Sequence, residues 1–397
     1  MEEKIFKNSK VKKLYIILAI LLILLIPIGF LKGIVSDRVE YRNTAVSTVK
    51  QSWAGEQTLN APFLNLSSSD GKITKAFVLN NYNVTTSVNT DLRKKGIFTV
   101  PVYTANVEIK GDFVNNSGNI NNAKAELGFG VSDSKGFVEQ PQFKLLDGNL
   151  QSVNDIKFSK NITTSEKLIP FEIKYKIRGL NTIFFAPCGQ NNKISISGNW
   201  ANPSFEGDFL PTERQVSNDN FNASWSIPSI ANASIKNPKL GVSFLMPVDN
   251  YRMSERAVKY SFLFLTLTFL TYFIYEITQK RKNPIHQLQY LLMGIAMLIF
   301  YLLLVSMSEF IPFALSYTIA AAMTIGLISI YTYFVITKRE NPQFSQLITG
   351  ILILLYSFLY VLLRLQDLAL IAGSFGMFFI IALVMYSTRN IDWYNDN

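Results

Sequence analysis

Long apolar stretches, separated by one long polar segment, dominate the pattern of hydrophobic and polar positions in this chain. The first apolar stretch, Leu14–Phe30, is long enough with its flanks to cross a hydrocarbon core of about 30 Å. Five more stretches follow after residue 256: Ala257–Ile277, Leu288–Met307, Phe310–Ile336, Gln346–Leu363 and Leu368–Ser387. The pattern therefore predicts a membrane protein with six transmembrane α-helices, one N-terminal and five C-terminal.

The first apolar stretch is predicted to stay in the membrane as an anchor. A cleaved signal peptide has an apolar centre of about 7–15 residues followed by a small-residue cleavage site. Here the stretch is longer, contains Pro27, and leads into a charged segment that begins at Asp37 without such a site. The alternative is a signal peptide, which would leave a mature chain that begins after residue 30.

Basic residues in the short connectors predict the orientation. The five N-terminal lysines, the connectors 278–287 and 337–345 and the C-terminal tail together hold eleven Lys or Arg, whereas the short connectors on the other side hold only Arg364. Positive charge in short loops favours the cytoplasmic side. We therefore expect both termini in the cytoplasm and the long segment 33–256 in the periplasm.

The long polar segment changes from helical to strand periodicity. Residues Val35–Trp53 are predicted to form a helix that leaves the membrane, and beyond Leu59 the apolar period becomes two, as in Thr99–Phe113 and Ile169–Ile177. Clusters of Asn, Gly and Ser separate these runs. This pattern predicts a large inserted all-β, sandwich-like periplasmic domain. The predicted regions are a cytoplasmic tail and first span (1–32), the β-rich domain with its leading helix (33–256), a five-helix bundle (257–387) and a cytoplasmic tail (388–397).

The composition agrees with a membrane protein and argues against several other classes. Hydrophobic residues make up 49% of the 397 residues and charged residues only 17%. The net charge of +10 is explained by residues beside the apolar stretches, so we expect no nucleic-acid partner. A single cysteine, Cys188, and a single histidine, His286, give no intramolecular disulfide and little basis for a metal or thiol site. No cofactor is predicted.

Candidate chemistry is sparse. The sequence lacks a phosphate-binding glycine loop, an H-E-x-x-H motif and a G-x-S-x-G motif, so we do not expect an enzyme. The carboxylates Glu206 and Asp208 leave a membrane-bound enzyme as an alternative, although a turn at Gly207 explains them more simply. The strongest local hypothesis is an outer-interface polar cluster of Glu309, Arg364 and Asp367. Glu309 and Arg364 are predicted at the same depth, where they either pair or reach water separately.

Several sequence blocks, in a fixed order over nearly the whole chain, resemble the CreD family of bacterial inner-membrane proteins, which are known as cell envelope integrity proteins. The blocks are LLIPIGFLKGIVSDRVEYR, RKKGIFTVPVYTANVEIKGDF, NWANPSFEGDFLPTERQVSNDNFNASW, GVSFLMPVDNYRMSERAVKYSFLF, YLLLVSMSEFIPFALSYTIAA, LLYSFLYVLLRLQDLALIAGS and ALVMYSTRNIDWY. One departure is FVLNNYNVTT, where the family tends to carry a Leu-Pro-acidic segment. Any role that depends on that acid is therefore in doubt for this chain.

The resemblance implies an inner-membrane protein of a Gram-negative-type envelope. It also implies a link to the Cre two-component regulon, envelope stress, colicin tolerance and β-lactam response, with no established catalytic activity. The leading hypothesis is thus a non-enzymatic envelope-integrity and stress-response protein. Its partners would be the lipid bilayer and an envelope protein or a cell-wall or lipid ligand bound by the periplasmic domain. A membrane facilitator of a lipid or cell-wall precursor is the main alternative.

Overall fold

The computed structural model describes residues 9–67, 73–116, 118–146, 148–149, 152–154, 156–232, 234–244, 250–278, 285–337, 342–365 and 369–389. The chain consists of two compact units. A helical unit contains the residues up to Tyr41 and from Val248 onward, and a β-rich unit contains Arg42–Pro247. The predicted basic connectors Lys280–Lys282 and Lys338–Arg339 and most of the tail 388–397 lie outside the described residues.

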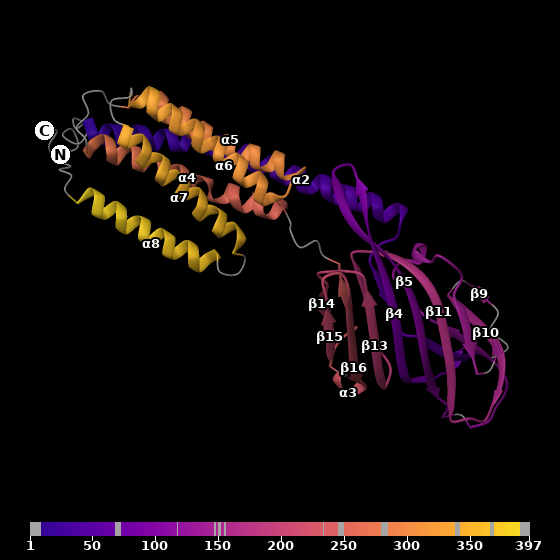
Figure 1. Ribbon diagram of the computed structural model, residues 1–397. Coiled ribbons are helices and arrows are strands. Elements are labelled where there is room, and N and C mark those ends of the chain that lie inside the picture. Colours follow the sequence, from indigo (N-terminus) through magenta and orange to yellow (C-terminus); the bar gives the residue numbers. More distant parts are fainter. Residues whose placement is uncertain are drawn as a thin grey trace. The chain divides into compact units, whose positions relative to one another are not determined.

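The helical unit is built from long apolar helices (Figure 1). They are α2 (Ser9–Ser52), α4 (Asn250–Thr278), α5 (Gln287–Ser308), α6 (Phe313–Tyr331) with the π-helical turn η2 (Thr332–Ile336), α7 (Pro342–Arg364) and α8 (Ala369–Thr388). In the described ranges, five stretches are long and apolar enough to cross a membrane: those of α2, α4, α5, α6 with η2, and α7. Helix α8 corresponds to the sixth predicted span, and its apolar part, Ile371–Tyr386, is shorter. Transmembrane-capable helices are thus confirmed at five of the six predicted positions.

Helix α2 is a single element where the sequence pattern predicts a span followed by a separate helix. It runs for 44 residues, or about 66 Å at 1.5 Å per residue. Pro27 lies within it, in the apolar part, where membrane helices tolerate proline because neighbouring groups satisfy the freed carbonyl. Beyond Gly33 no glycine or proline interrupts it before Ser52, so the helical hydrogen bonds continue into the polar segment.

One face of α2 packs into the helical unit. The buried residues recur at intervals of three and four, as expected for a helix with a single apolar contact face: Ile17, Ile20, Leu21, Leu24, Ile28, Leu31 and Val35. On α5, a side chain at Gly294 would collide with Leu24 of α2 and Phe269 of α4. The glycine therefore allows close approach of these helices, as small residues do in membrane bundles.

The β-rich unit contains three sheets. The four-stranded sheet has the order β1 (Gln57–Leu59), β12 (Thr182–Phe185), β17 (Leu240–Ser243), β14 (Ser204–Gly207). The five-stranded sheet has the order β3 (Ile73–Ala76), β2 (Phe63–Ser67), β6 (Ile120–Gly128), β10 (Lys157–Thr164), β9 (Ser152–Asn154). The eight-stranded sheet has the order β15 (Glu213–Val216), β16 (Phe221–Pro228), β13 (Asn191–Gly198), β4 (Val78–Lys95), β5 (Phe98–Val114), β11 (Leu168–Leu180), β7 (Gln142–Leu145), β8 (Gly148–Asn149). Short helices η1 (Ser134–Gly136) and α3 (Ser229–Asn232) complete the unit.

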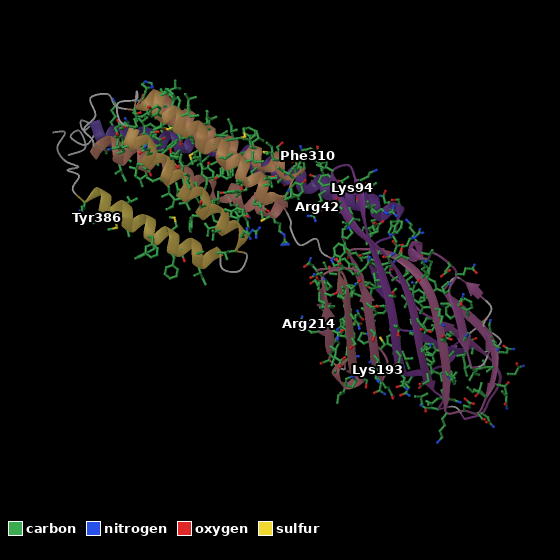
Figure 2. The ribbon with its side chains drawn as sticks, in the orientation of Figure 1. Arg42, Lys94, Lys193, Arg214, Phe310 and Tyr386 are labelled. Atoms are coloured by element: carbon green, nitrogen blue, oxygen red, sulfur yellow. The ribbon has the colours of Figure 1, made fainter. Side chains whose placement is uncertain are left out.

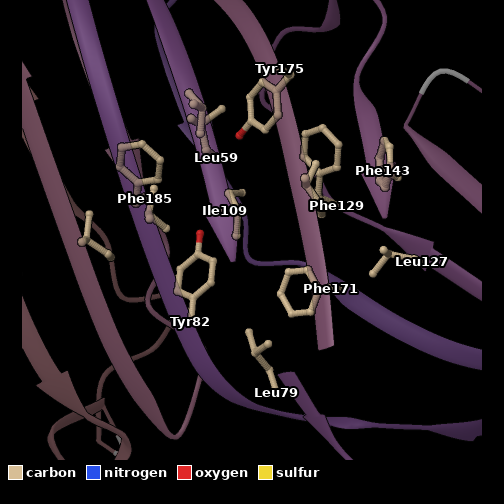
Figure 3. Packing of buried hydrophobic residues seen from close by; sticks show 14 of the residues in the cluster. Leu59, Leu79, Tyr82, Ile109, Leu127, Phe129, Phe143, Phe171, Tyr175 and Phe185 are labelled. Atoms are coloured by element: carbon tan, nitrogen blue, oxygen red, sulfur yellow. The ribbon is translucent and has the colours of Figure 1, made fainter. Parts of the chain in front are cut away.

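Alternating side chains of the strands form one apolar core. On β5, Ala105, Val107 and Ile109 are buried while the residues between them are more exposed, which is the predicted period of two. Figure 3 shows Ile109 with inward-facing neighbours from other strands, among them Tyr82 and Phe171. The predicted all-β domain is confirmed as a set of stacked sheets around this core.

The C-terminal turns of α2 belong to the β-rich unit. Val49 is buried against Val100, Val102 and Leu180, at the end of the eight-stranded sheet that carries the last part of β11. The ring of Trp53 just beyond the helix lies 4.9 Å from the guanidinium carbon of Arg93 and 4.5 Å from that of Arg178. Two cation–π contacts and an apolar patch therefore fix the exit of α2 to the sheet.

Candidate functional site

Glu309, the centre of the predicted polar cluster, lies at the carboxyl end of α5 and pairs with α2. Its Oε1 atom is 3.1 Å from Nε of Arg38. The Glu309 side chain is only 6% exposed, whereas the Arg38 side chain is 42% exposed. Among the described residues, Glu309 Oε1 accepts no hydrogen bond, so attraction between opposite charges is what holds the contact.

Glu309 contacts Arg38 and not Arg364, whose pairing with Glu309 is one of the two arrangements that the sequence left open. The Arg364 guanidinium lies over the ring of Tyr360, one turn earlier on α7, with 5.6 Å between its carbon and the ring centroid. The carboxyl end of α7 also receives Arg256 of α4, whose Nη2 donates to the carbonyl oxygens of Leu362 and Leu363. Glu309 and Arg364 are predicted at equal depth in the membrane, but their side chains contact different partners. Asp367, the third member, lies outside the described residues.

A second buried carboxylate holds the opposite end of α2. Glu276, near the end of α4, forms an ion pair with Lys13, with side chains 9% and 18% exposed respectively. Glu276 also accepts hydrogen bonds from the Ile285 amide at 3.2 Å and the Tyr290 hydroxyl at 3.3 Å. Lys13 in turn donates to the Ile285 carbonyl at 2.8 Å and lies 5.7 Å from the Tyr290 ring centroid. Sequence reasoning had placed Lys13 only as a topology signal.

The two cations lie on the same side of α2. Lys13 and Arg38 are 25 residues apart, which is nearly seven turns and about 37 Å. The buried apolar face, from Ile17 to Val35, lies between them. The sequence carried a signal for this arrangement, because a basic residue stands one turn beyond each end of that apolar face.

In the β-rich unit, the outward side of the eight-stranded sheet is exposed and polar, and we call it the open face. Backbone pairing aligns its side chains in three rows, two across six strands and one across five. The rows are Ser224, Ser195, Thr85, Glu108, Lys174 and Gln142; Asn222, Ser197, Ser87, Asn106 and Lys176; and Ser226, Lys193, Asn83, Lys110, Glu172 and Lys144. None of these residues is apolar. Figure 2 shows Lys193 among the polar tips of this unit, in contrast to the carbon-rich side chains of the helices.

The two carboxylates of the open face are each paired with lysines, and the five lysines of the rows leave the face with a net positive charge. Glu108 lies 2.7 Å from Lys110 and 3.1 Å from Lys174, and Glu172 lies 3.0 Å from Lys174 and 3.3 Å from Lys144. Hydrogen bonding to the Lys174 ammonium, with help from Lys144, lowers the pKa of Glu172 to about 2. The Lys110 and Lys174 ammonium groups likewise lower the pKa of Glu108. Both carboxylates therefore stay ionised over the whole physiological range.

The carboxylates considered for catalysis, Glu206 and Asp208, have separate places. Glu206 pairs with Gly241 in the ladder of β14 and β17. Gly207 has a φ of +111°, a conformation that favours glycine, and Asp208 accepts a hydrogen bond from the Lys239 amide at 2.9 Å. Asp208 thus stabilises the end of the strand pair. Within the described ranges, no three His, Cys, Asp or Glu residues come together in a way that could hold a metal ion.

Comparisons with known proteins point in one direction. The family model described as Inner membrane protein CreD matches residues 9–394. The protein of that name from Escherichia coli (strain K12) is 29% identical over an alignment of 418 positions, gaps included, which covers 94% of this chain and 91% of the relative.

Similarity to solved structures is weak. A putative nutrient binding protein from Legionella pneumophila matches with 7% identity and a TM-score of 0.29, over 55% of this chain and 79% of that one. An M1 zinc metallopeptidase from Deinococcus radiodurans matches with 8% identity and a TM-score of 0.22, over 42% of each chain. These two values carry no argument about fold or function. The match that spans nearly all of the sequence does, and it shows that the chain belongs to the CreD family of inner membrane proteins.

Proposed function

We propose that this protein is a non-enzymatic envelope protein whose β-rich unit, on the periplasmic side, binds a hydrophilic polymer of the envelope, of which a cell-wall glycan fits best. The observation that carries the proposal is the open face: three aligned rows of hydroxyl, amide and charged side chains, in which both carboxylates are paired with lysines. With strands about 4.8 Å apart, six strands offer a surface about 24 Å wide. That width suits an extended chain better than a small molecule.

The chemistry of the rows favours a glycan over a protein partner. Ser, Thr, Asn and Gln side chains both donate and accept hydrogen bonds, as a ligand covered with hydroxyl groups requires. The cores of protein interfaces are instead enriched in aromatic residues, Met and Arg, and depleted in Lys, Glu and Ser. The rows of the open face have the opposite composition.

A pocket lined partly by residues of the rows provides a place for one specific group of such a polymer. It measures about 410 Å³, within the usual size of ligand sites, and its lining includes Thr85, Ser87, Asn106, Glu139 and Gln140. Glu139 and Gln140 come from the segment before β7 and line the pocket together with the residues of β4 and β5.

The two alternatives receive less support. A facilitator needs ionisable or polar groups free to contact a substrate within the membrane. The buried carboxylates Glu276 and Glu309 are instead paired with cations of α2. An enzyme that used Glu206 and Asp208 would need both free, yet Asp208 is occupied by the Lys239 amide.

Photo-crosslinking in growing cells tests the proposal. A photoreactive residue at Ser87 or Asn106, which face each other on β4 and β5, should capture a glycan-containing polymer. The adduct should become smaller after digestion with a cell-wall glycan hydrolase. Lys236, exposed on the segment before β17, is the matched control and should give little adduct. Capture of only proteins from the open face, or equal capture at Lys236, would reject the proposal.

A further inference from the structure

The inner end of α2 is held by several interactions of different kinds. Lys13 has the Glu276 carboxylate, the Ile285 carbonyl and the face of Tyr290 as partners. Both carboxylate oxygens of Glu276 are engaged, one by Lys13 and the Ile285 amide and the other by the Tyr290 hydroxyl. Separation at this end would therefore leave several buried polar groups without partners, which is unfavourable.

The outer end of α2 is held differently. The Arg38–Glu309 contact is an ion pair without a hydrogen bond to Glu309 Oε1 among the described residues, and the Arg38 side chain is 42% exposed. An exposed arginine loses little when it leaves, because water can solvate it. Glu309 loses more, because it is buried and closes the carboxyl end of α5, where the helix dipole disfavours a negative charge. The ion pair is therefore favoured over the separated residues, and the cost of separation falls mainly on Glu309.

Helix α2 continues beyond Arg38 into the β-rich unit. The part of α2 up to Tyr41 belongs to the helical unit, and the part from Arg42 onward belongs to the β-rich unit. In the β-rich unit, Val49 and Trp53 pack against residues of the sheet. No glycine or proline lies between Arg38 and Ser52 to absorb a bend. Arg38 is therefore the last ionic contact of α2 in the helical unit before the helix joins the other unit.

From this asymmetry we infer that Arg38–Glu309 is a releasable latch on the outer end of α2, whereas Lys13–Glu276 and the buried face from Ile17 to Val35 hold the rest of the helix in place when the latch opens. A force on the last turns of α2 then opens the outer contact first. When the force ends, the ion pair forms again, because a buried carboxylate without its cation is unfavourable. The latch does not depend on what the β-rich unit binds.

Spin-label distances in full-length protein in lipid nanodiscs test the latch. With Cys188 replaced by Ser, cysteines at Tyr41 and Phe310 report the outer end, and cysteines at Leu14 and Leu288 report the inner end. All four positions are exposed, so labels there leave the packed faces intact. When both ion pairs are intact, the distances between the labels should be narrowly distributed at the outer end and at the inner end.

Neutralisation of either latch residue, by Arg38→Gln or Glu309→Gln, should broaden and shift the outer distribution and leave the inner one unchanged. Arg38→Lys should keep the outer distribution narrow, because charge alone suffices, and the exchanged pair Arg38→Glu with Glu309→Arg should restore it. Glu276→Gln should broaden the inner distribution. An outer distribution that stays narrow in both neutral variants would overturn the inference, as would a shift of both ends together.

Discussion

At the scale of single residues, the core of the β-rich unit contains tyrosine hydroxyls in two different situations. The Tyr103 hydroxyl donates to the Thr182 carbonyl at 2.7 Å. The Tyr82 hydroxyl, equally buried, has no hydrogen-bond partner among the described residues, and Figure 3 shows it surrounded by apolar side chains. Burial raises the pKa of both phenols well above the usual value, so both stay neutral at any physiological pH.

These two tyrosines give a matched pair of substitutions. Tyr103→Phe removes a buried hydrogen bond to the Thr182 carbonyl, so the free energy of unfolding should fall by about 1–2 kcal/mol. Tyr82→Phe removes a hydroxyl without a partner, so the free energy of unfolding should stay the same or rise slightly. Urea unfolding of the detergent-solubilised protein, followed by tryptophan fluorescence, measures both. An equal loss in the two variants would show that the assigned hydrogen bond is unimportant.

Residues of the membrane helices show how far sequence reasoning reaches. Hydropathy placed Glu309 and Arg364 near span ends, because charged residues are costly within the apolar core. It could not identify Arg38 as the partner of Glu309, because that choice depends on how the helices rotate and neighbour one another. The choice of partner for Glu309 thus depends on packing, which a single sequence does not contain.

At the scale of elements, the periodicity of apolar residues predicts individual strands but not the order of the strands in a sheet. Strand β5 follows the predicted alternation, since its buried residues face the core. Pairings such as Asn83 with Lys193, in the parallel contact of β4 and β13, join segments more than a hundred residues apart. Such long-range pairings follow from the whole core, so strand order and the aligned rows of the open face were not predictable.

The charged ladder of β5, β11 and β7 should make stability depend on acid pH. The pKa of Glu172 is about 2 in the folded state, against an ordinary value of 4.5, chiefly because of Lys174. A lowered folded pKa gives stability that is complete above pH 4.5 and is lost as the pH falls toward 2. Because the ladder is exposed to solvent, the effect should be no more than about 1 kcal/mol.

Glu172→Gln tests this dependence. The variant should match the unmodified protein near pH 2 and be less stable above pH 4.5, so its stability profile should be flatter across that interval. Chemical unfolding at a series of pH values measures the difference. Glu213→Gln, on the exposed edge strand β15, is the control and should leave the profile unchanged. Parallel profiles for Glu172→Gln and the unmodified protein would contradict the assigned role of Lys174.

At the scale of the whole molecule, hydropathy alone separated a membrane part from a polar part. The compact β-rich unit, residues 42–247, lies inside the segment 33–256 that lacks any predicted span. Its side of the membrane is a separate question, because it depends on connector charges and not on packing. The positive-inside rule predicts that this unit is periplasmic and that the start of α5 is close to the cytoplasm.

The single native cysteine makes that orientation measurable. Cys188 is exposed in the β-rich unit, so a membrane-impermeant maleimide should label it in intact spheroplasts if the unit is periplasmic. Partial burial raises the pKa of the thiol, so labelling should be faster at pH about 8.5 than at neutral pH, where less thiolate is present. Cys188→Ser should abolish the signal, and Cys188→Ser with Gln287→Cys, at the start of α5, should be labelled only after the membrane is permeabilised. Labelling of Cys188 only after permeabilisation would place the β-rich unit in the cytoplasm. The open face could then not meet a cell-wall glycan, whatever its chemistry.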